Sequence, residues 1–262
     1  MKSTSTAEAI SAQLLAQLPQ HPAEAAVHSV FRTSVNLLWQ GQRVTLLDDT
    51  RPLYPCAVRL GGSVPLLSIG EPAFLSRERI EIPHSGVSVD LTRATVTSLS
   101  LFSPLLPLQM PHSAAPQALR EIIITGGKPE GFAPLLFLLE NEPCPLPDNP
   151  YVRYAAVRIP ALFTALQQKD PAAAAEAAYS IAGCGIGLTP SADDFLCGVM
   201  ASVLACAIAH GEQNNWLPLT AAMAQRAGTR TNLISAAFLR QAACGQLSSD
   251  VLTLVRTFYS SV

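Results

Sequence analysis

The chain is organised around the stretch Gly183-Cys184-Gly185-Ile186-Gly187-Leu188-Thr189-Pro190-Ser191-Ala192-Asp193-Asp194-Phe195. Three glycines at alternate positions come first, and glycine lets a backbone adopt positive φ and approach a ligand closely. Thr189 before Pro190 predicts a helix with a threonine N-cap, while Ser191 with Asp194 offers a second register, a capping box. In either register a helix begins here, and its free N–H groups face the glycine loop.

This helix start predicts an anion site, because the first N–H groups of a helix have no partner within it. The two acids either stabilise the helix dipole or hold a divalent cation that bridges to a phosphorylated or carboxylate ligand. Neighbours on a helix point about 100° apart, so Asp193 and Asp194 are expected to do different jobs. Mg²⁺ is the one cofactor that this pattern suggests. The ligand-binding candidates here are Gly183, Gly185, Gly187, Thr189 and Ser191, and the catalytic candidates are Ser191, Asp193 and Asp194.

A second polar cluster, Thr229-Arg230-Thr231-Asn232-x-x-Ser235, interrupts two apolar helical segments. Thr231 and Ser235 share a helix face, as do Asn232 and Ser235. One interpretation is an ordinary N-cap with exposed hydroxyl groups. The other is a hydroxyl and amide face that meets the glycine loop and binds a small polar ligand, with Arg230 gripping a carboxylate or phosphate in bidentate fashion.

The N-terminal half has a different character. Residues 26–112 hold short runs of β-branched and aromatic residues between glycine and proline turns. Turn signals at roughly 8–12-residue spacing are typical of a β-barrel or sandwich. Parallel strands would need a helix between them, and none fits. Strand alternation puts Arg32, Ser34 and Asn36 on one face, either a pocket wall or a solvated outer face, and Asn36 is kept as a ligand-binding candidate.

The predicted fold is therefore α+β, with an N-terminal β-barrel or sandwich-like domain and a mainly α-helical C-terminal domain. Residues 1–25 are expected to form a helix over residues 7–18 and a linker. The β-rich domain spans residues 26–112. The helical domain spans residues 113–262 and carries the glycine motif.

Composition restricts the partners. Of 262 residues, 49% are hydrophobic and 14% charged, which hints at contacts with other subunits or copies, although an alanine-rich helical domain raises the same figure. A net charge of −2 gives no electrostatic case for nucleic acid or an anionic membrane. The longest near-apolar run, residues 195–209, is shorter than the roughly 20 residues of a membrane span. Six cysteines without Cys-x-x-Cys pairs fit a reducing cytoplasm.

Both polar clusters carry a family resemblance. Residues 183–198 read Gly-x-Gly-x-Gly-Leu-Thr-Pro-Ser-x-Asp-Asp-x-Leu-x-Gly and resemble the hallmark of the AllH family. That family comprises the small subunit of the bacterial oxamate carbamoyltransferase assembly and relatives of unassigned function. The pattern Thr231-x-x-Ile234-Ser235-x-x-Phe238-Leu239 and the Val35-Asn36-Leu37 strand are similar to the same family. For the assembly, the resemblance implies phosphorolysis of oxalurate to oxamate and carbamoyl phosphate.

Two hypotheses follow. In the first, the chain is a subunit of a carbamoyltransferase or of an enzyme acting on a related small acid. Such a transfer needs no protein nucleophile, because positioning and electrostatic stabilisation suffice. The amides of Gly185 and Gly187, with Thr189 and Ser191, then hold the phosphate or carboxylate of a phosphate, carboxylate or carbamoyl compound. Arg230 and Asn232 contact its other end, and Thr231 and Ser235 are kept as further ligand-binding candidates. In the second, the chain is a non-catalytic anion-binding or scaffolding subunit. Both expect a small anionic metabolite and either other protein subunits or a homo-oligomer as partners.

Overall fold

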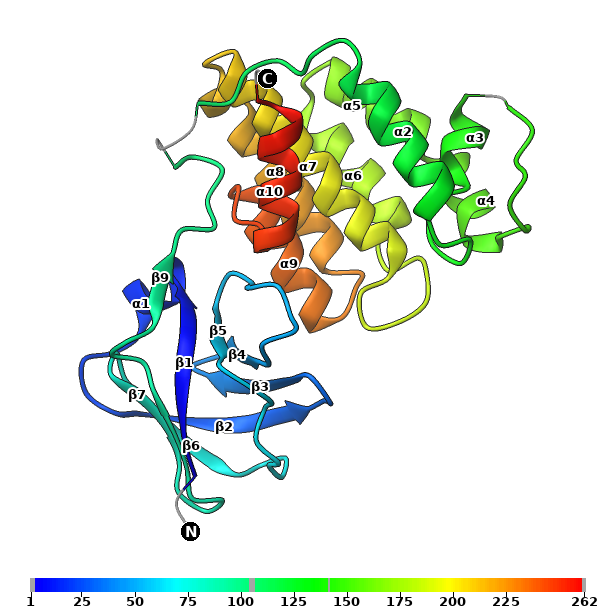
Figure 1. Ribbon diagram of the computed structural model, residues 1–262. Coiled ribbons are helices and arrows are strands. Elements are labelled where there is room, and N and C mark those ends of the chain that lie inside the picture. The colour runs from blue at the N-terminus through cyan, green and yellow to red at the C-terminus, as the bar shows by residue number, and fades with distance from the viewer. Residues whose placement is uncertain (1–2, 104–106, 141, 261–262) are drawn as a thin grey trace. The chain divides into compact units, whose positions relative to one another are not determined.

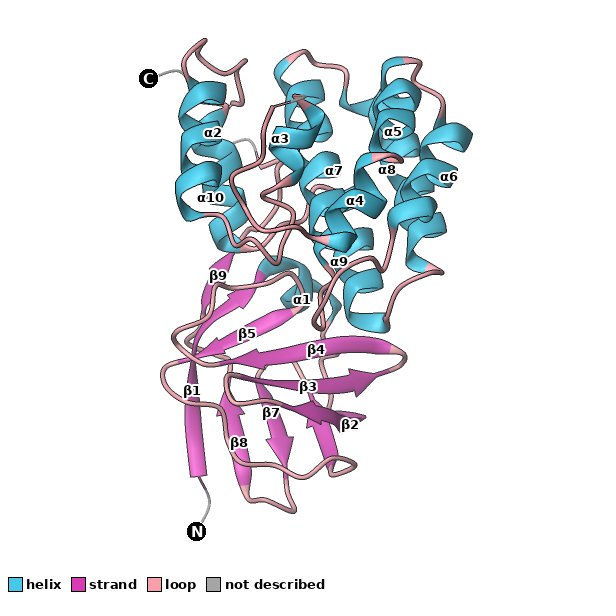
Figure 2. Ribbon diagram, turned by 90° about the vertical axis from the view of Figure 1, so that its right-hand side faces the viewer, coloured by secondary structure: helices cyan, strands magenta, loops and turns pink. Residues whose placement is uncertain are grey.

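The computed structural model describes residues 3–103, 107–140 and 142–260, so the extreme ends of the first and third predicted domains lie outside it. The chain divides into two compact units. One contains Met1–Ser100 with Leu247–Thr253, and the other contains Leu101–Gln246 with Leu254–Val262. The described strands all belong to the first unit, and helices predominate in the second (Figures 1 and 2). The predicted α+β class is confirmed.

The N-terminal unit is a closed barrel. Its elements are β1 (Ser3–Ser11), α1 (Ala12–Gln17), β2 (Ala23–Val30), β3 (Ser34–Trp39), β4 (Gln42–Leu47), β5 (Ala57–Leu60), β6 (Pro72–Leu75), β7 (Arg79–Ile82), β8 (Val87–Asp90) and β9 (Thr95–Thr97). Eight of the described strands form a ring in the order β1-β5-β4-β3-β2-β6-β7-β8, and β9 pairs with β1 beside β8. Closure decides between the two predicted architectures, because a sandwich would leave its sheets open at the edges.

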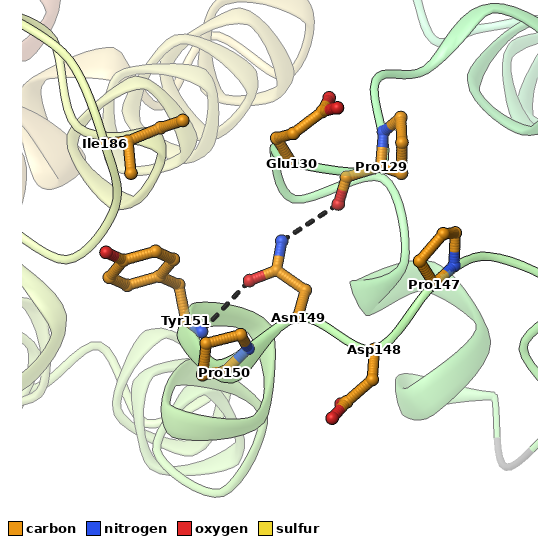
Figure 3. Close-up of a pocket in the computed structure, with 8 residues that line it drawn as sticks. All are labelled: Pro129, Glu130, Pro147, Asp148, Asn149, Pro150, Tyr151 and Ile186. Carbon is orange, nitrogen blue, oxygen red and sulfur yellow. Dashed lines mark hydrogen bonds between the residues drawn. The ribbon is translucent and has the colours of Figure 1, made fainter.

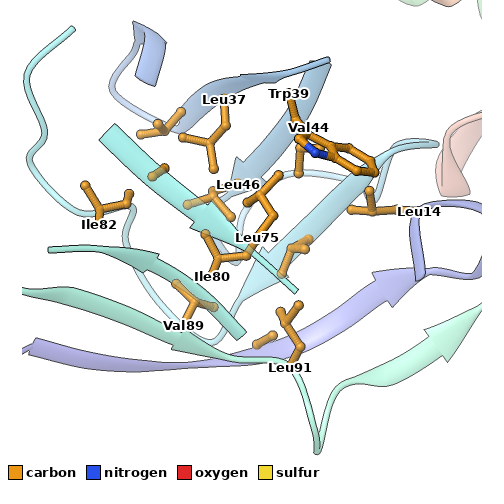
Figure 4. Packing of buried hydrophobic residues seen from close by; sticks show 14 of the residues in the cluster. Leu14, Leu37, Trp39, Val44, Leu46, Leu75, Ile80, Ile82, Val89 and Leu91 are labelled. Carbon is orange, nitrogen blue, oxygen red and sulfur yellow. The ribbon is translucent and has the colours of Figure 1, made fainter. Parts of the chain in front are cut away.

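The barrel interior is filled by the alternating apolar side chains of its strands. In β3, Val35 and Leu37 are fully buried and Trp39 nearly so, while Leu38 between them is 43% exposed. Figure 4 shows Leu37 and Leu46 converging with the side chains of the opposite strands. A barrel of eight strands has an interior just wide enough for its own side chains. The buried side chains of the strands therefore form the core of this unit.

The predicted helix over residues 7–18 is wrong in its first half. Residues up to Ser11 form β1, and only Ala12–Gln17 are helical, with the Ser11 hydroxyl accepting from the Leu14 N–H at 3.1 Å. The pattern misleads because Ile10 and Leu14 are both buried, but Ile10 faces the core from a strand. β1 pairs with β5 on one side and with β8 and β9 on the other, and this pairing outweighs a marginal local helical preference.

The expectation that every strand pair is antiparallel is also wrong. β4–β5, β1–β8 and β1–β9 are parallel pairs. No helix connects β4 to β5; the connection is a loop over residues 48–56. In a closed barrel, strands that are distant in sequence can become neighbours. Parallel pairs therefore form here without the connecting helix that parallel strands of an open sheet usually have. The segment 64–69, whose apolar residues predict a strand, is a loop in which Leu66 is 95% exposed.

The C-terminal unit is helical. Its helices are α2 (Ala115–Gly126), α3 (Leu135–Leu139), α4 (Pro150–Ala156), α5 (Ile159–Gln167), α6 (Pro171–Ile181), α7 (Ser191–Ala209), α8 (Gln213–Gly228) and α9 (Leu233–Ala243), and α10 (Ser249–Phe258) begins in the barrel unit and ends here. α8 packs against α6 and α9, and α7 packs against α8 and α9. The sequence predicts one helix over residues 152–168, but the chain breaks it before Pro160, as proline disfavours a continuous helix.

α7 is the central element for the site. Among the described helices it is the one long and apolar enough, by length and composition alone, to cross a membrane, and 44% of that window is buried in the structure. Leu196, Met200 and Leu204 are fully buried along one face. Since this face packs on α8 and α9, we interpret α7 as the core helix of its unit.

Candidate functional site

The glycine bend leads into α7, but the helix begins differently from either predicted register. Pro190 is the N-cap, with φ −52° and ψ 140°, and no side chain caps the helix. The Pro190 carbonyl accepts from the N–H groups of Asp193 at 2.8 Å and Asp194 at 3.2 Å. The Ala192 N–H donates to the Cys184 carbonyl at 2.9 Å. Several N–H groups at the start of α7, which the sequence predicts to be free, therefore donate to carbonyls of the bend itself.

Positive φ angles shape the bend: +73° at Gly183, +127° at Gly185 and +93° at Gly187. A Cβ on Gly183 would lie 2.7 Å from the Arg230 carbonyl oxygen, and one on Gly185 would lie 2.5 Å from the Ser191 nitrogen. A Cβ on Gly187 would meet open space. The first two glycines therefore permit close packing of the backbone, while Gly187 lies at the exposed tip.

Asp193 holds the bend in place from inside the protein. It is 1% exposed, and its Oδ1 accepts from the Gly183 N–H at 2.8 Å. Its Oδ2 accepts from the Thr231 hydroxyl at 2.5 Å. One carboxylate thereby joins the glycine bend to the segment between α8 and α9. Asp193 and Thr231 are positioning residues in this arrangement, since both use their polar groups on the protein itself.

The second polar cluster does meet the glycine bend. The Asn232 amide donates to the Leu188 carbonyl at 2.9 Å, and its Oδ1 caps α9 by accepting from the Ile234 and Ser235 N–H groups. The buried Ser235 hydroxyl also reaches the Leu188 carbonyl, at 3.5 Å. Both interpretations of this cluster hold in part, because Asn232 is a helix cap and also an anchor for the bend. Direct contact of Asn232 or Ser235 with a ligand stays a prediction.

Arg230 lies beside the bend with its guanidinium group on the end of α6. It donates to the carbonyls of Tyr179 at 3.0 Å and Ser180 at 3.1 Å, and to the Tyr154 hydroxyl at 3.1 Å. These contacts fix the orientation of its exposed side chain. The carbonyls at a helix C-terminus attract a cation, which explains this position.

The groups that remain open to a ligand gather at the start of α7. Among the described residues, no hydrogen-bond partner is found for the Ser191 hydroxyl or for the N–H groups of Gly185, Gly187 and Ser191. A Cβ added to Gly131 would lie 4.0 Å from the Ser191 Oγ, so a turn distant in sequence approaches this hydroxyl. The predicted anion donors therefore come from the bend and from Ser191 rather than from the whole first turn of α7.

Asp194 has the opposite environment to its neighbour. Desolvation raises the pKa of its carboxyl to about 6, a hydrogen bond with the Thr189 side chain opposes the shift, and the Asp193 charge adds to it. The residue nonetheless has a solvent-exposed surface. A carboxyl that is reachable from solvent and close to neutral in pKa can hold or release a proton at physiological pH.

Two family models match the segments just described. The model described as "Oxamate carbamoyltransferase subunit AllH" matches residues 181–261, and the "AllH family N-terminal domain" matches residues 4–96. The chain belongs to the AllH family. Its two family-specific segments are thus the barrel and the region running from the glycine bend to α10. Comparisons with curated proteins and with solved structures gave no match.

Asp193 and Asp194 do not fit a Mg²⁺ site that both would share. Mg²⁺ needs an octahedral shell of oxygen ligands, usually with one or two carboxylates facing it. Both oxygens of Asp193 already accept hydrogen bonds within the protein. Within the described ranges, no group of three or more histidine, cysteine, aspartate or glutamate side chains could hold a metal ion. Asp193 is therefore not available for a shared site, and Mg²⁺ held by Asp194 together with a phosphate ligand stays a prediction.

Asn36 lies in the AllH N-terminal domain, on the outer face of β3, and is 4% exposed. Its amide donates to the Ser29 hydroxyl at 2.9 Å, and its Oδ1 accepts from the Thr45 hydroxyl at 2.8 Å. These bonds link three neighbouring strands. The polar groups of Asn36 are therefore used within the barrel unit, whereas the glycine bend belongs to the other unit.

A hollow of about 270 Å³ lies on the Ile186 side of the bend. Figure 3 shows Ile186 across the hollow from Glu130, and Asn149 reaching from the start of α4 to the Pro129 carbonyl. The Asn149 amide donates to the carbonyls of Pro129 at 2.9 Å and Gly131 at 3.0 Å, which fixes the turn against α4. No motif in the sequence indicates this hollow, because its walls come from loops whose proline-rich sequence predicts only turns.

The sequence also gives little sign of Tyr154 and Arg158, which lie beside the bend. The Arg158 guanidinium carbon lies 3.6 Å from the centre of the Tyr154 ring. Their spacing of four residues within a predicted helix is a usable signal, since such residues share a face. The sequence does not show that this helix lies against the glycine bend. In the structure, the thiol of Cys184 in the bend approaches the Tyr151 carbonyl at 3.7 Å.

Proposed function

We propose that this AllH-family chain is a subunit of an oxamate carbamoyltransferase-like enzyme, which converts oxalurate and phosphate to oxamate and carbamoyl phosphate. The observation that carries the proposal is the rigidly held glycine bend with unpartnered donors at its mouth. Asp193, Asn232 and Ser235 contact the bend, and the N–H groups of Gly185 and Gly187 have no hydrogen-bond partner among the described residues. Preorganised backbone donors of this kind stabilise an oxyanion without reorganising during the reaction.

In the proposed reaction, a phosphate oxygen attacks the carbamoyl carbon of oxalurate. A C–O bond forms, the C–N bond breaks, and the departing oxamate nitrogen takes up a proton. The bend amides and the Ser191 hydroxyl hold the phosphate oxygens. We assign delivery of that proton to Asp194, because its carboxyl is exposed and its pKa is raised to about 6.

Exposed apolar side chains around the bend support a site completed by another subunit. Ile186 is 56% exposed, Leu188 54% and Leu233 77%. Apolar side chains that gather beside polar donors are typical of a protein contact surface. The same observation also favours the second candidate function, a subunit that presents a bound anion to a catalytic partner without reacting itself.

The test is carbamoyl phosphate formation by the purified chain alone and by the chain together with the other subunits of the assembly. We expect turnover only in the assembly. Asp194→Asn should lower kcat by about 10²-fold or more, the range for loss of a general acid. Ser191→Ala should lower kcat/KM by about tenfold or more, through loss of an anion donor.

The matched control is Ser202→Ala, which removes an exposed hydroxyl from the same helix, away from its start. Wild-type turnover in assemblies carrying Ser191→Ala or Asp194→Asn would contradict the catalytic proposal. If the variants supported full turnover, and omission of the chain abolished it, the scaffolding function would be the better description.

A further inference from the structure

Tyr154 of α4 carries two guanidinium groups at once. Arg158 stacks over its ring, with the guanidinium carbon 3.6 Å from the ring centre. Arg230 donates from Nη2 to its hydroxyl oxygen at 3.1 Å, and this hydroxyl donates in turn to the Ser180 carbonyl at 2.9 Å. Two cations from segments far apart in the sequence are thus held against one aromatic side chain, close to the glycine bend.

No carboxylate neutralises this pair. In the described part of the chain, the ion pairs include neither Arg158 nor Arg230, whereas the nearby Arg226 is paired with Glu176 at 2.7 Å. Asp193, which contacts the bend, uses both its oxygens on Gly183 and Thr231. Two cations held against one side chain repel each other, so an anion that contacts both would stabilise the arrangement.

The position of one of the two arginines is explained by the carbonyl groups at the end of α6. Arg230 neutralises the carbonyls of Tyr179 and Ser180, a usual place for a cation. Arg158 makes one such bond, from Nη1 to the Tyr154 carbonyl at 2.7 Å, and its other N–H groups stay available among the described residues. Because a guanidinium group carries five donors, both arginines keep donors for a ligand.

We propose that Arg158, Arg230 and Tyr154 form an oxyanion-binding site of this chain, which takes the carboxylate or phosphate group of a small metabolite. The site adjoins the glycine bend, because a Cβ on Gly183 would lie 2.7 Å from the Arg230 carbonyl oxygen and the Cys184 thiol approaches the Tyr151 carbonyl of α4 at 3.7 Å. An anion there would accept charge-assisted hydrogen bonds from both guanidinium groups. The inference rests on the proposed function for its ligand class: a small acid held at one end by the bend would reach the arginine pair with the other.

The experiment measures anion binding by the full-length chain without partners, by thermal shift and calorimetry. Inorganic phosphate and oxamate are used in separate titrations, so that a phosphate and a carboxylate ligand are distinguished. We expect at least one of them to raise the Tm of the wild-type chain. Arg158→Ala and Arg230→Ala should each weaken that ligand at least tenfold, and Arg158→Lys should recover part of the loss.

Arg240→Ala is the matched control, because Arg240 is an exposed cation on α9 away from this cluster. Tyr154→Phe keeps the ring under Arg158 and removes the hydroxyl that orients Arg230, so an intermediate affinity is expected. Each variant is compared with its own ligand-free Tm, which separates lost binding from lost stability.

The inference is overturned if neither anion stabilises the wild-type chain, or if Arg158→Ala binds as tightly as wild type. It is also overturned if Ser191→Ala abolishes binding while both arginine variants keep it, since the anion would then lie on the bend alone. That last result would leave the proposed function standing. Partner-dependent turnover that survives Ser191→Ala and Asp194→Asn would instead contradict the proposed function and leave the anion site intact.

Discussion

Asp193 and Asp194 show how far two identical neighbouring side chains can diverge in role. Asp193 points into the protein and accepts two hydrogen bonds, so its charge is compensated locally. Asp194 keeps an exposed surface, but the partial burial of its carboxyl raises its pKa to about 6. Their divergence follows from the angular step of a helix, which the sequence already implies. The inward acid is Asp193, whose carboxylate accepts a hydrogen bond from Thr231, a residue distant in sequence.

At Asp193, loss of the carboxylate should destabilise the helical unit. Asp193→Ala leaves the Gly183 N–H and the Thr231 hydroxyl without their acceptor, at a cost of about 2–4 kcal/mol in the free energy of unfolding. Asp193→Asn keeps one acceptor and should cost about half as much. Chemical denaturation of the three proteins measures both values. A loss below about 0.5 kcal/mol for Asp193→Ala would show that the clamp is dispensable.

At Asp194, the prediction concerns pH. The carboxyl has a folded pKa of about 6 against an ordinary value of 3.8, so the folded state binds more protons than the unfolded state between these values. Its contribution to stability therefore falls as pH rises from about 4 to about 6, and is constant above. Asp194→Asn removes this contribution. The Tm of the variant relative to wild type should rise across that window and then level off, and a parallel pair of curves would contradict the raised pKa.

The bend between α6 and α7 behaves as one element because its glycines are not equivalent. Gly185→Ala would place a Cβ 2.5 Å from the backbone nitrogen of Ser191, so the start of α7 must move. Gly187→Ala meets open space and should cost only the strain of its positive φ, about 1 kcal/mol. We expect Gly185→Ala to cost clearly more, about 2–3 kcal/mol, and to abolish anion-dependent stabilisation.

Gly187→Ala serves as the control for that comparison, since it changes the same residue type in the same bend. Calorimetric unfolding with and without phosphate gives both quantities. Equal behaviour of the two variants would mean that close backbone packing at Gly185 does not shape the site.

Elements with local signals are predicted well from the sequence. α9 runs from Leu233 to Ala243 after an asparagine cap, and α6 begins after Asp170, whose carboxylate accepts from two N–H groups. The start of α7 has equally strong signals but a different cap, because the bend packs back on it through the Cys184 carbonyl. β1 is mistaken for a helix for a similar reason: its partners are distant strands, and no local pattern encodes them.

The candidate site is predicted in its residues but less well in its roles. Thr231, Asn232 and Ser235 do lie against the glycine bend, as their polar character indicates. The sequence cannot show that their polar groups hold the bend, since a hydroxyl that binds a ligand and one that binds a carbonyl look alike. The sequence does not single out Arg158, because only the structure shows that Arg158 stacks on the Tyr154 ring while Arg230 donates to the hydroxyl of the same residue.

At the scale of the whole chain, the barrel unit is not continuous in sequence. Leu247–Thr253 belong to it together with Met1–Ser100, although the segments between them form the helical unit. The Leu247 N–H donates to the Leu99 carbonyl at 2.9 Å, and the Ser249 N–H donates to the Leu53 carbonyl at 2.9 Å. A fragment that ends near residue 100 would therefore lack the segment Leu247–Thr253 of its unit. A domain boundary drawn at the proline-rich linker does not reveal this missing segment.

The last prediction tests this discontinuity through Ser249. Its hydroxyl accepts from the N–H of Leu53 at 3.0 Å, and Leu53 is 2% exposed. Ser249→Ala leaves that N–H without a partner and should cost about 1–2 kcal/mol, while Ser249→Thr keeps the hydroxyl and should cost less. Amide hydrogen exchange in the full-length chain reads this locally, because Leu53 should lose protection in Ser249→Ala alone. Unchanged exchange at Leu53 in both variants would mean that the barrel is held without the segment Leu247–Thr253, and that residues 1–100 form a complete unit.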